Sequence, residues 1–304
     1  VLYPTNAYEP LVSEIPKLCK DSNSKSFFLI DNWDNLSSKS ILLNKPDYLA
    51  VWGEQTKKHA TYIQNINSKN IFCIGTPRYD KFFYYRNQKL KSHYKYKYIL
   101  FLGTALEFDE ESAIKKIDQI LFRNKIFFNN CKLIYRPHPW RQSKNIIDID
   151  KLKQTVLDKQ LSNQYYRRNS DTSFQPNLNY YPSLISNSEF IVGGLTSMMI
   201  ESLIFKKKYL ALIFDDKKNY TNQHYVFKYF VHFQEIKKMK NIFLFKNING
   251  EFLENYLKKL WKFKKKQNNK TLDKELNFII NNNKTSYKTR LELKIDKIIN
   301  EKNN

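Results

Sequence analysis

Eight short apolar runs recur along the chain, and each of them ends in polar or small residues. They are rich in Ile, Leu, Phe and Val without strict alternation, which is typical of parallel strands buried on both faces. The runs are "SFFLIDNWDN", "DYLAVWGEQ", "NIFCIGTPR", "YILFLGT", "KLIYRPHP", "EFIVGGLTS", "YLALIFDD" and "NIFLFKN". Helical patterns lie between several of them, in "EQTKKHATYIQNI", "EESAIKKIDQILF", "SMMIESLIF" and "FLENYLKKLWKF". Strands and helices in alternation predict an α/β fold.

The chain has 304 residues, which is enough for two domains. The polar, basic stretch 84–97 follows three strand candidates and precedes five, so we place a domain boundary there. We predict a first domain over residues 1–90, a second over 91–265 and a helical tail over 266–304, which would pack on the first domain or fray. The first domain is short, and we interpret it as truncated at its amino end. Residues 165–184 have no period and are predicted to form a long surface loop.

The opening stretch "VLYPTNAYEPL" has the pattern of neither a signal peptide nor a membrane span. The three cysteines, Cys19, Cys73 and Cys131, are far apart in the sequence, and two of them lie inside apolar runs. This spacing fits buried thiols in a reducing cytoplasm better than disulfides or a metal cluster. We therefore expect a cytoplasmic protein without a structural metal.

The net charge of +23 is compatible with a nucleic acid, a membrane surface or an anionic substrate as partner. An AT-rich genome would give the same excess of Lys beside abundant Asn, Ile, Tyr and Phe, and the two explanations stay open. No RNA-binding module, zinc-finger spacing or Arg-rich recognition helix accompanies the charge. We therefore expect no nucleic-acid partner.

Unusual polar clusters follow the strand candidates, at the edge where open α/β sheets bind ligands. In "EFIVGGLTSMMIESLIF", Gly193 and Gly194 end a strand, and Thr196 and Ser197 open a helix. Glycines allow close approach to a ligand, and a helix start favours a phosphate. A tight turn followed by an ordinary helix cap explains the same residues. Glu201 would accept from ribose hydroxyls or only interact with the helix dipole.

The stretch "YRPHPWRQ" holds a histidine between two prolines, which restrict the backbone around it. His138 can donate to a phosphate oxygen or pass a proton to a leaving group. Arg136 and Arg141 add forked donors suited to phosphate or carboxylate. A structural, hydrogen-bonded histidine is the alternative, but the flanking prolines and arginines favour a functional one.

Two carboxylates, Asp31 and Asp34, follow the first apolar run, and Glu54 follows the second. A carboxylate at such a strand end can be a general base, whereas an Asx turn would explain Asp34 structurally. Metal binding is the weaker interpretation, because no further ligands stand nearby in the sequence. In "IGTPRYD", Arg78 would point toward a ligand or belong to an ordinary turn.

Taken in order, "DNWDNLSSK", "PDYLAVWGEQ", "IGTPRYD", "YRPHPWR" and "GGLTSMMIE" resemble bacterial surface-carbohydrate biosynthesis proteins with two facing Rossmann-like domains, the GT-B arrangement. The set is also loosely similar to the capsule Kdo transferases and the teichoic-acid glycerophosphotransferases. These segments cover roughly residues 29–214.

The resemblance implies a glycosyl or glycerophosphoryl transferase that acts without a metal or other cofactor. The second domain would bind a nucleotide-sugar donor, with His138, Thr196 and Ser197 on its phosphates and Glu201 toward the ribose. The first domain would hold a glycan or lipid-linked acceptor, with Asp31 or Asp34 as the base. The departure from the family is that the amino-terminal strands, where many such enzymes keep a Gly-rich acceptor loop, are not seen.

Two other classes stay open. A nucleotide-sugar epimerase on the same fold would need an acid and a base around the sugar but no acceptor groove. A basic nucleic-acid or membrane-binding protein would need its charge to cluster, and residues 256–270 hold the one dense run. On a helix over 252–266, lysines occupy much of the surface that the apolar residues leave, which predicts peripheral contact with the inner face of a membrane.

Overall fold

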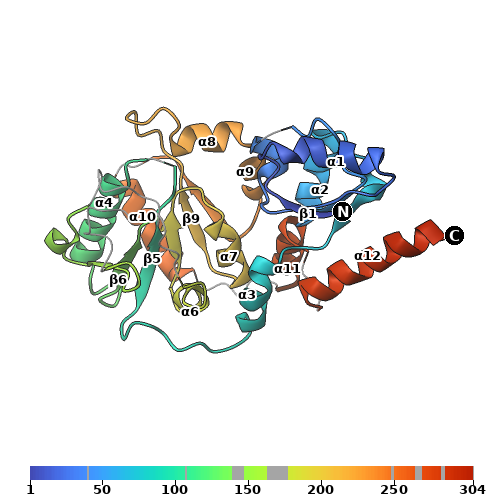
Figure 1. The fold of residues 1–304 in the computed structure, drawn as a ribbon. Helices are drawn as coiled ribbons and strands as arrows, with labels where there is room; N and C mark the ends of the chain where they lie inside the picture. The colour runs from blue at the N-terminus through green and yellow to red at the C-terminus, as the bar shows by residue number, and fades with distance from the viewer. Residues whose placement is uncertain are drawn as a thin grey trace. The chain divides into compact units, whose positions relative to one another are not determined.

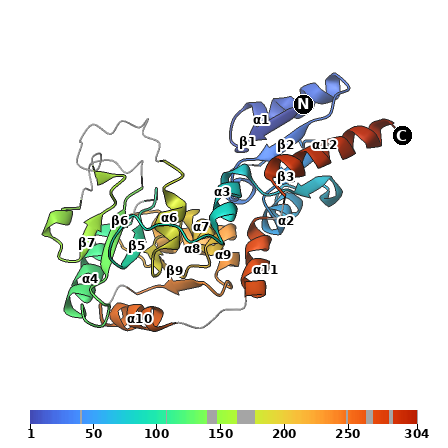
Figure 2. The same cartoon turned by 90° about the horizontal axis from the view of Figure 1, so that it is seen from below.

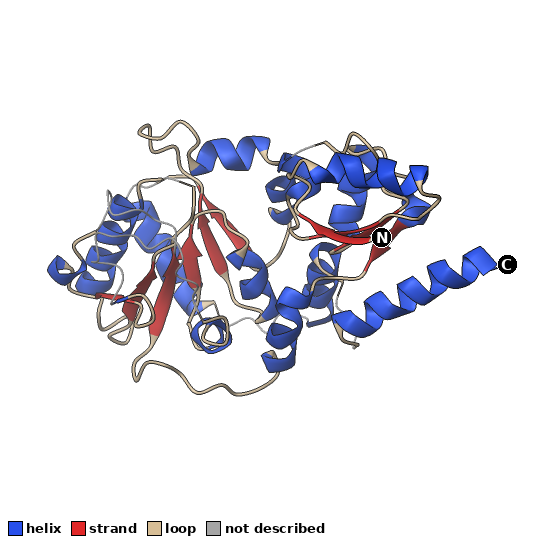
Figure 3. Cartoon of the chain, viewed as in Figure 1, coloured by secondary structure: helices blue, strands red, loops and turns tan. Residues whose placement is uncertain are grey.

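The computed structural model describes residues 1–39, 41–106, 108–138, 147–162, 177–247, 250–263, 269–281 and 285–303. Its strands form two separate parallel sheets (Figure 3). The chain divides into two compact units (Figure 1). Unit 1 comprises Val1–Tyr84, Phe230–Glu235 and Asn269–Asn304, and unit 2 comprises Tyr85–Tyr229 and Ile236–Asn268.

Unit 1 is built on a four-stranded parallel sheet in the order β1-β2-β3-β4. The strands are β1 (Leu2–Thr5), β2 (Phe27–Ile30), β3 (Tyr48–Val51) and β4 (Ile71–Cys73). The helices include α1 (Leu11–Asp21), a π-helical turn (Asn35–Lys39), α2 (Glu54–Tyr62), α3 (Asp80–Tyr85), α9 (Val231–Ile236), α11 (Asn269–Ile279) and α12 (Tyr287–Asn303). Short 3-10 turns lie at Ser68–Asn70 and Pro77–Tyr79.

Both faces of this sheet are covered. On one face, Phe28 and Ile30 of β2 form a core with residues of α1 and α2. On the other face, Phe27 joins a cluster with Leu291 and Ile295 of α12, which runs along the sheet (Figure 2). Burial on both faces explains why these strands are apolar without alternation.

Unit 2 has a six-stranded parallel sheet in the order β10-β9-β8-β5-β6-β7. The strands are β5 (Tyr98–Leu102), β6 (Lys132–Arg136), β7 (Thr155–Leu157), β8 (Ile191–Gly193), β9 (Tyr209–Leu212) and β10 (Ile242–Phe245). The helices include α4 (Glu110–Arg123), α6 (Tyr181–Ser186), α7 (Met198–Ile204), α8 (Gln223–Tyr229) and α10 (Gly250–Lys262), with a 3-10 turn at Ile149–Lys151. Leucines and isoleucines of α4 and α10 share one buried cluster with β5, β6, β8 and β9.

All eight predicted strands and the predicted α/β class are confirmed. The prediction of a loop over 165–184 is wrong at its end, because α6 begins at Tyr181. The rest of that stretch lies largely outside the described residues. Of the two alternatives left open for residues 266–304, the helices α11 and α12 follow the first, because they belong to unit 1 and bury their apolar faces against its core. Among the described residues, no helix is long and apolar enough to cross a bilayer.

Candidate functional site

The strand order of unit 2 places a topological switch point between β5 and β8. From β5 the chain continues outward through β6 and β7, whereas β8, β9 and β10 extend the sheet on the other side. Open α/β sheets bind ligands at the carboxyl ends of the strands beside such a point. The loops that follow β5 and β8, residues 103–106 and 194–197, are named here the switch-point loops.

Gln223, the first residue of α8, joins the two switch-point loops. Its side chain is fully buried, and Oε1 accepts a hydrogen bond from the Leu195 N–H at 2.6 Å. Its Nε2 donates to Thr104 Oγ1 at 3.4 Å. Sequence reasoning missed this residue, because it stands in a polar stretch without a motif and acts only through the strand order.

The predicted donor-site glycines allow the chain to pack closely on itself. A methyl group at Gly194 would lie 2.8 Å from Thr104 Cγ2 and equally near the Gln223 side chain. At Gly193 it would overlap the Leu102 carbonyl and lie 2.9 Å from the Tyr209 hydroxyl. Contacts within unit 2 therefore account for both glycines, and an approach to donor phosphate stays a prediction.

Thr196 and Ser197 stand at the start of α7 and are partly exposed. Thr196 Oγ1 accepts from the Met198 N–H at 3.5 Å, and the Ser197 side chain makes no capping bond. Glu201 is 2% exposed, and its charge adds to burial in raising the pKa of Tyr209. The hydroxyls are therefore accessible to a ligand at the carboxyl end of β8, while the Glu201 carboxylate lies inside the fold near Tyr209.

His138 follows β6 and adjoins the loop after β5. Its backbone nitrogen lies 2.8 Å from the position that a Cβ would take at Gly103. The side chain is partly buried, and this burial lowers the pKa of His138 to about 4. The imidazole is therefore neutral at pH 7 in the free protein. Arg141 lies outside the described residues.

Arg136 has its guanidinium inside a polar network. It is 3% exposed, and its NH1 donates to Asp158 Oδ1 at 2.9 Å, while NH2 donates to Gln160 Oε1 at 2.6 Å. The guanidinium also lies over the Tyr181 ring at 4.2 Å. Asp158 in turn accepts from the Tyr180 hydroxyl at 3.3 Å. This geometry favours a structural role for Arg136 over the predicted contact with a donor.

Glu110 forms a hydrogen bond with the loop after β5. Sequence reasoning did not single this residue out. It is fully buried, and Oε1 accepts from the Thr104 N–H at 3.0 Å. Oε2 accepts from the Tyr135 hydroxyl at 2.8 Å. The carboxylate therefore fixes Thr104, which also bonds Gln223. The sequence signal was available, since a third acidic residue at the start of an amphipathic helix exceeds what capping requires.

In unit 1, the carboxyl end of β2 carries Asp31 and Asp34. Asp31 is exposed, and its backbone N–H donates to the Thr5 carbonyl at 2.9 Å. The Asp34 side chain is 17% exposed and lies 3.7 Å from Lys39 Nζ. Burial raises the pKa of the Asp34 carboxyl above its ordinary value, and the nearby Asp31 charge adds to the rise. A carboxylate with a raised pKa is suited to accepting a proton.

The other two predicted residues of unit 1 lie beside the returning carboxyl-terminal segment. A methyl group at Gly53, next to Glu54, would lie 2.6 Å from the Ile279 carbonyl. One at Gly75, where φ is +77°, would lie 2.6 Å from the Asn281 carbonyl. The Arg78 guanidinium lies 5.5 Å from the neighbouring Tyr79 ring. The chain itself therefore occupies the ends of β3 and β4, which supports the turn interpretation for "IGTPRYD".

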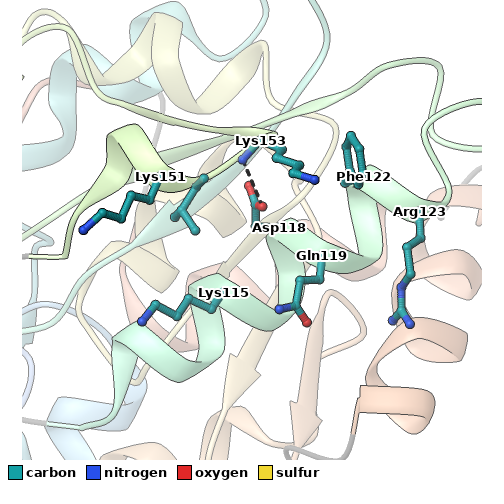
Figure 4. A pocket seen from close by; sticks show the side chains of 8 residues that line it. Lys115, Asp118, Gln119, Phe122, Arg123, Lys151 and Lys153 are labelled. Atoms are coloured by element: carbon teal, nitrogen blue, oxygen red, sulfur yellow. Dashed lines mark hydrogen bonds between the residues drawn. The ribbon is translucent and has the colours of Figure 1, made fainter.

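A cavity of about 400 Å³ lies elsewhere in unit 2 (Figure 4). It is lined by Lys115, Asp118, Gln119, Phe122, Arg123, Lys151, Leu152 and Lys153. Lys151–Lys153 precede β7, so this cavity is at the amino end of a strand and away from the switch point. None of the predicted site residues lines it. In the part of the chain that the structure describes, no group of three or more His, Cys, Asp or Glu side chains is placed to hold a metal.

Neither a protein-family model nor a curated protein matches the chain. Solved structures do. The chain is similar to UDP-GlcNAc 2-epimerase from Methanocaldococcus jannaschii, with a TM-score of 0.55 and 14% identity over 97% of this chain and 76% of the epimerase. A putative UDP-N-acetylglucosamine 2-epimerase from Listeria monocytogenes gives a TM-score of 0.54 and 13% identity over 91% and 68% of the two chains.

The wall teichoic acid polymerase TagF, in a structure determined with CDPG, gives a TM-score of 0.50 and 18% identity. This match covers 85% of the present chain and 59% of the polymerase, so the chain spans about three fifths of that protein's length. The chain has a GT-B fold. At these identities the likeness establishes the fold of the protein and does not identify its reaction.

Proposed function

We propose that this GT-B protein is a transferase that moves a sugar or a glycerol phosphate from a nucleotide-activated donor to a growing surface polysaccharide or glycolipid. The observation that carries the proposal is the switch point of unit 2, where residues that follow β5, β6 and β8 come together. Two of the similar structures are named with nucleotide-linked compounds, a UDP-GlcNAc 2-epimerase in one case and TagF with CDPG, or CDP-glycerol, in the other.

The donor phosphates would lie against the switch-point loops. Backbone N–H groups and the hydroxyls of Thr196 and Ser197 supply neutral donors there, and His138 adds one ring N–H. An anionic phosphate beside His138 would raise its pKa from about 4, because a nearby negative charge favours the imidazolium. The protonated ring would then stabilise the departing nucleotide, which is the task that a metal ion performs in other transferases.

The acceptor hydroxyl would be deprotonated by a carboxylate of unit 1. Asp34 fits this role better than Asp31, because burial raises the pKa of Asp34 and makes it the stronger base. Asp31 is exposed and would contact the acceptor or act through its charge on Asp34. The proposal uses no cofactor, and the nucleotide-sugar is a substrate.

An epimerase is the second candidate, since the M. jannaschii epimerase matches 97% of the chain at a TM-score above that of the polymerase. Both reactions begin with a nucleotide-sugar bound at the switch-point loops, and both use a carboxylate and an acid. They differ in the need for an acceptor. Transfer releases the nucleotide only when an acceptor hydroxyl is present, whereas epimerisation changes the sugar without one.

We also propose that the acceptor is linked to a lipid and that the protein meets it at the cytoplasmic face of the membrane through peripheral contact. The support is the lysine-rich surface of α10, together with the requirement that a glycolipid acceptor stays in its bilayer.

The function is tested first by binding. CMP, CDP and UDP are compared in a thermal shift experiment, where a nucleotide at a hundred times its Kd adds about 2.7 kcal/mol to the free energy of unfolding. CDP-glycerol and UDP-GlcNAc then serve as donors, with and without a polyprenyl-phosphate-linked acceptor. Nucleotide release that requires the acceptor supports transfer. An altered sugar without acceptor would establish the epimerase instead, and the absence of binding by all three nucleotides would contradict both.

His138→Ala is expected to lower kcat by about a hundredfold or more, which is the usual effect of losing a positioned acid–base group. His224→Ala is the matched control, because His224 is an exposed histidine on α8 of the same unit. Ser197→Ala should be milder, since backbone N–H groups supply most of the field at a helix start. An unchanged kcat for His138→Ala with an active donor would show that His138 is structural.

A further inference from the structure

Trp33 stands between the two candidate base residues, Asp31 and Asp34, and is 2% exposed. Its ring meets His232 edge-on, with centroids 4.8 Å apart and an interplanar angle of 70°. It meets Phe233 in the same way at 5.5 Å and 87°. Trp33 belongs to residues 31–34, named here the carboxylate loop. Its side chain is therefore held by two aromatic rings from one short segment, Phe230–Glu235.

His232 is itself fixed on both its ring and its backbone. The ring nitrogen Nδ1 lies 3.3 Å from Ser37 Oγ in the π-helical turn that continues the carboxylate loop. The His232 carbonyl accepts from Gln55 Nε2 at 2.9 Å. The residue is 2% exposed, and burial lowers its pKa to about 3, so the ring packs as a neutral group at physiological pH. His232 thus contacts the loop at Trp33 and again at Ser37.

Several polar atoms are buried around this contact. Among the described residues, the Asn35 side-chain nitrogen and Thr56 Oγ1 are buried without hydrogen-bond partners. Neither ring nitrogen of His59 has a hydrogen bond that meets normal geometry, although Glu235 Oε2 lies 3.4 Å from Nε2. Buried polar atoms of this kind reduce stability, and they concentrate at sites whose geometry serves a reaction.

The segment Phe230–Glu235 reaches unit 1 from the middle of unit 2 in the sequence. It continues directly from α8, whose first residue, Gln223, joins the switch-point loops. In the sequence, the residues that hold the carboxylate loop therefore stand close to Gln223 and far from the loop itself. Ser37 and His232 are 195 positions apart.

We propose that His232 is a positioning residue, which holds Trp33 and the π-helical turn so that Asp31 and Asp34 keep the placement that reaction requires. This inference rests on the proposed function, in which one of these carboxylates accepts the proton of the acceptor. Displacement of a reacting group by about 1 Å can lower a rate by about a hundredfold. Loss of the His232 ring removes the edge contact on Trp33 and the contact with Ser37 together.

The test compares His232→Ala and His232→Phe with His93→Ala. His93 is the matched control, because it is a partly buried histidine of unit 2 whose ring stacks on Tyr180 with centroids 3.9 Å apart, so its loss also removes an aromatic contact but not one with Trp33. Three quantities are measured well below the melting temperature of each variant. They are amide hydrogen exchange over residues 31–39, and kcat with CDP-glycerol or UDP-GlcNAc beside the Kd of the corresponding nucleotide.

His232→Ala is expected to raise exchange over 31–39 and to lower kcat by about tenfold or more, with the nucleotide Kd unchanged. His232→Phe should recover much of kcat, because it restores an aromatic edge on Trp33. His93→Ala should lose stability but keep both the exchange over 31–39 and kcat. Equal exchange over 31–39 in His232→Ala and the parent protein would overturn the positioning role, whether or not the protein is active. A parent protein inactive with both donors but with the expected exchange difference would instead overturn the proposed function alone.

Discussion

At the scale of single residues, the sequence predicts where a close contact occurs but not its partner. Five of the six glycines have no room for a methyl group, and in each case the obstacle is the chain itself. Arg136 shows the same limit, because its guanidinium does bind a carboxylate, that of Asp158 within unit 2. A glycine or an arginine records a steric or electrostatic need, which a ligand and a neighbouring loop satisfy equally well.

Burial lowers the pKa of His138, as it does that of His232, and so makes the free energy of unfolding depend on pH. An unfolded histidine titrates near 6.5, whereas burial lowers the pKa of His138 to about 4. Between these values the unfolded state binds the proton that the folded state does not, so the free energy of unfolding falls as pH decreases from 6.5 toward 4. Between pH 7 and pH 4.5, the free energy of unfolding of His138→Gln should fall by about 1 to 3 kcal/mol less than that of the parent protein. Urea unfolding at both pH values measures this, and equal losses would contradict the lowered pKa.

At the scale of elements, every central strand could be predicted, and so could the edge strands β4 and β10. All eight apolar runs are strands, but β1 and β7 were missed. Both stand at an edge of their sheet and are only four and three residues long, with Pro4 inside β1. An edge strand has one neighbour and needs less apolar sequence, and β1 and β7 lack the apolar run that β4 and β10 retain. The helix α6 was hidden in the same way, because its six residues are too few to show a period.

The attachment of α12 to unit 1 gives a prediction at this scale. Arg290 of α12 is 7% exposed, and its Nε donates to the Ile74 carbonyl at 2.7 Å. Its NH2 lies 3.7 Å from Asp80 Oδ1. Arg290→Met should lower the free energy of unfolding by about 1 to 3 kcal/mol, because the Ile74 carbonyl and Asp80 lose a buried donor. Lys288→Met is the control on the same helix, since its side chain is 83% exposed and should change stability by less than about 0.5 kcal/mol. Similar urea midpoints for the two variants would show that α12 contributes little.

At the scale of the whole molecule, the sequence indicated two α/β units, left the packing of the carboxyl-terminal helices open and gave no sign that Phe230–Glu235 belongs to unit 1. Unit 1 includes two segments from later in the chain. Phe230–Glu235 lies between β9 and β10 of unit 2, and Asn269–Asn304 follows β10. The bond from Arg290 to Ile74 spans 216 positions. Local patterns carry no information about contacts this distant. The switch point was hidden for the same reason, because it depends on strand order and each apolar run predicts only that a strand exists.

The charge of the whole molecule gives the last prediction, that of peripheral membrane contact through α10. The apolar side of this helix is occupied, since Leu253, Leu257 and Leu260 are at most 1% exposed in the core of unit 2. Its outer side presents Lys259 and Lys262, both exposed, and Lys262 Nζ lies 5.1 Å from the Phe127 ring centroid. Exposed lysines on one side of a helix suit an anionic lipid surface, where each lysine contributes about 1 kcal/mol. Lys264, Lys265 and Lys266 continue the run outside the described residues.

Changing Lys262, Lys264, Lys265 and Lys266 to Gln should therefore abolish most co-sedimentation with phosphatidylglycerol vesicles at low salt, and 0.5 M salt should do the same to the parent protein because it screens surface charge within about 4 Å. The control changes four exposed lysines of unit 1, Lys20, Lys69, Lys81 and Lys288, to Gln and so removes the same charge elsewhere. If codon bias alone explains the lysines, the two variants lose binding equally, since only net charge then matters. Loss confined to the α10 variant assigns the membrane contact to this helix, whereas no binding by the parent protein at low salt would refute it.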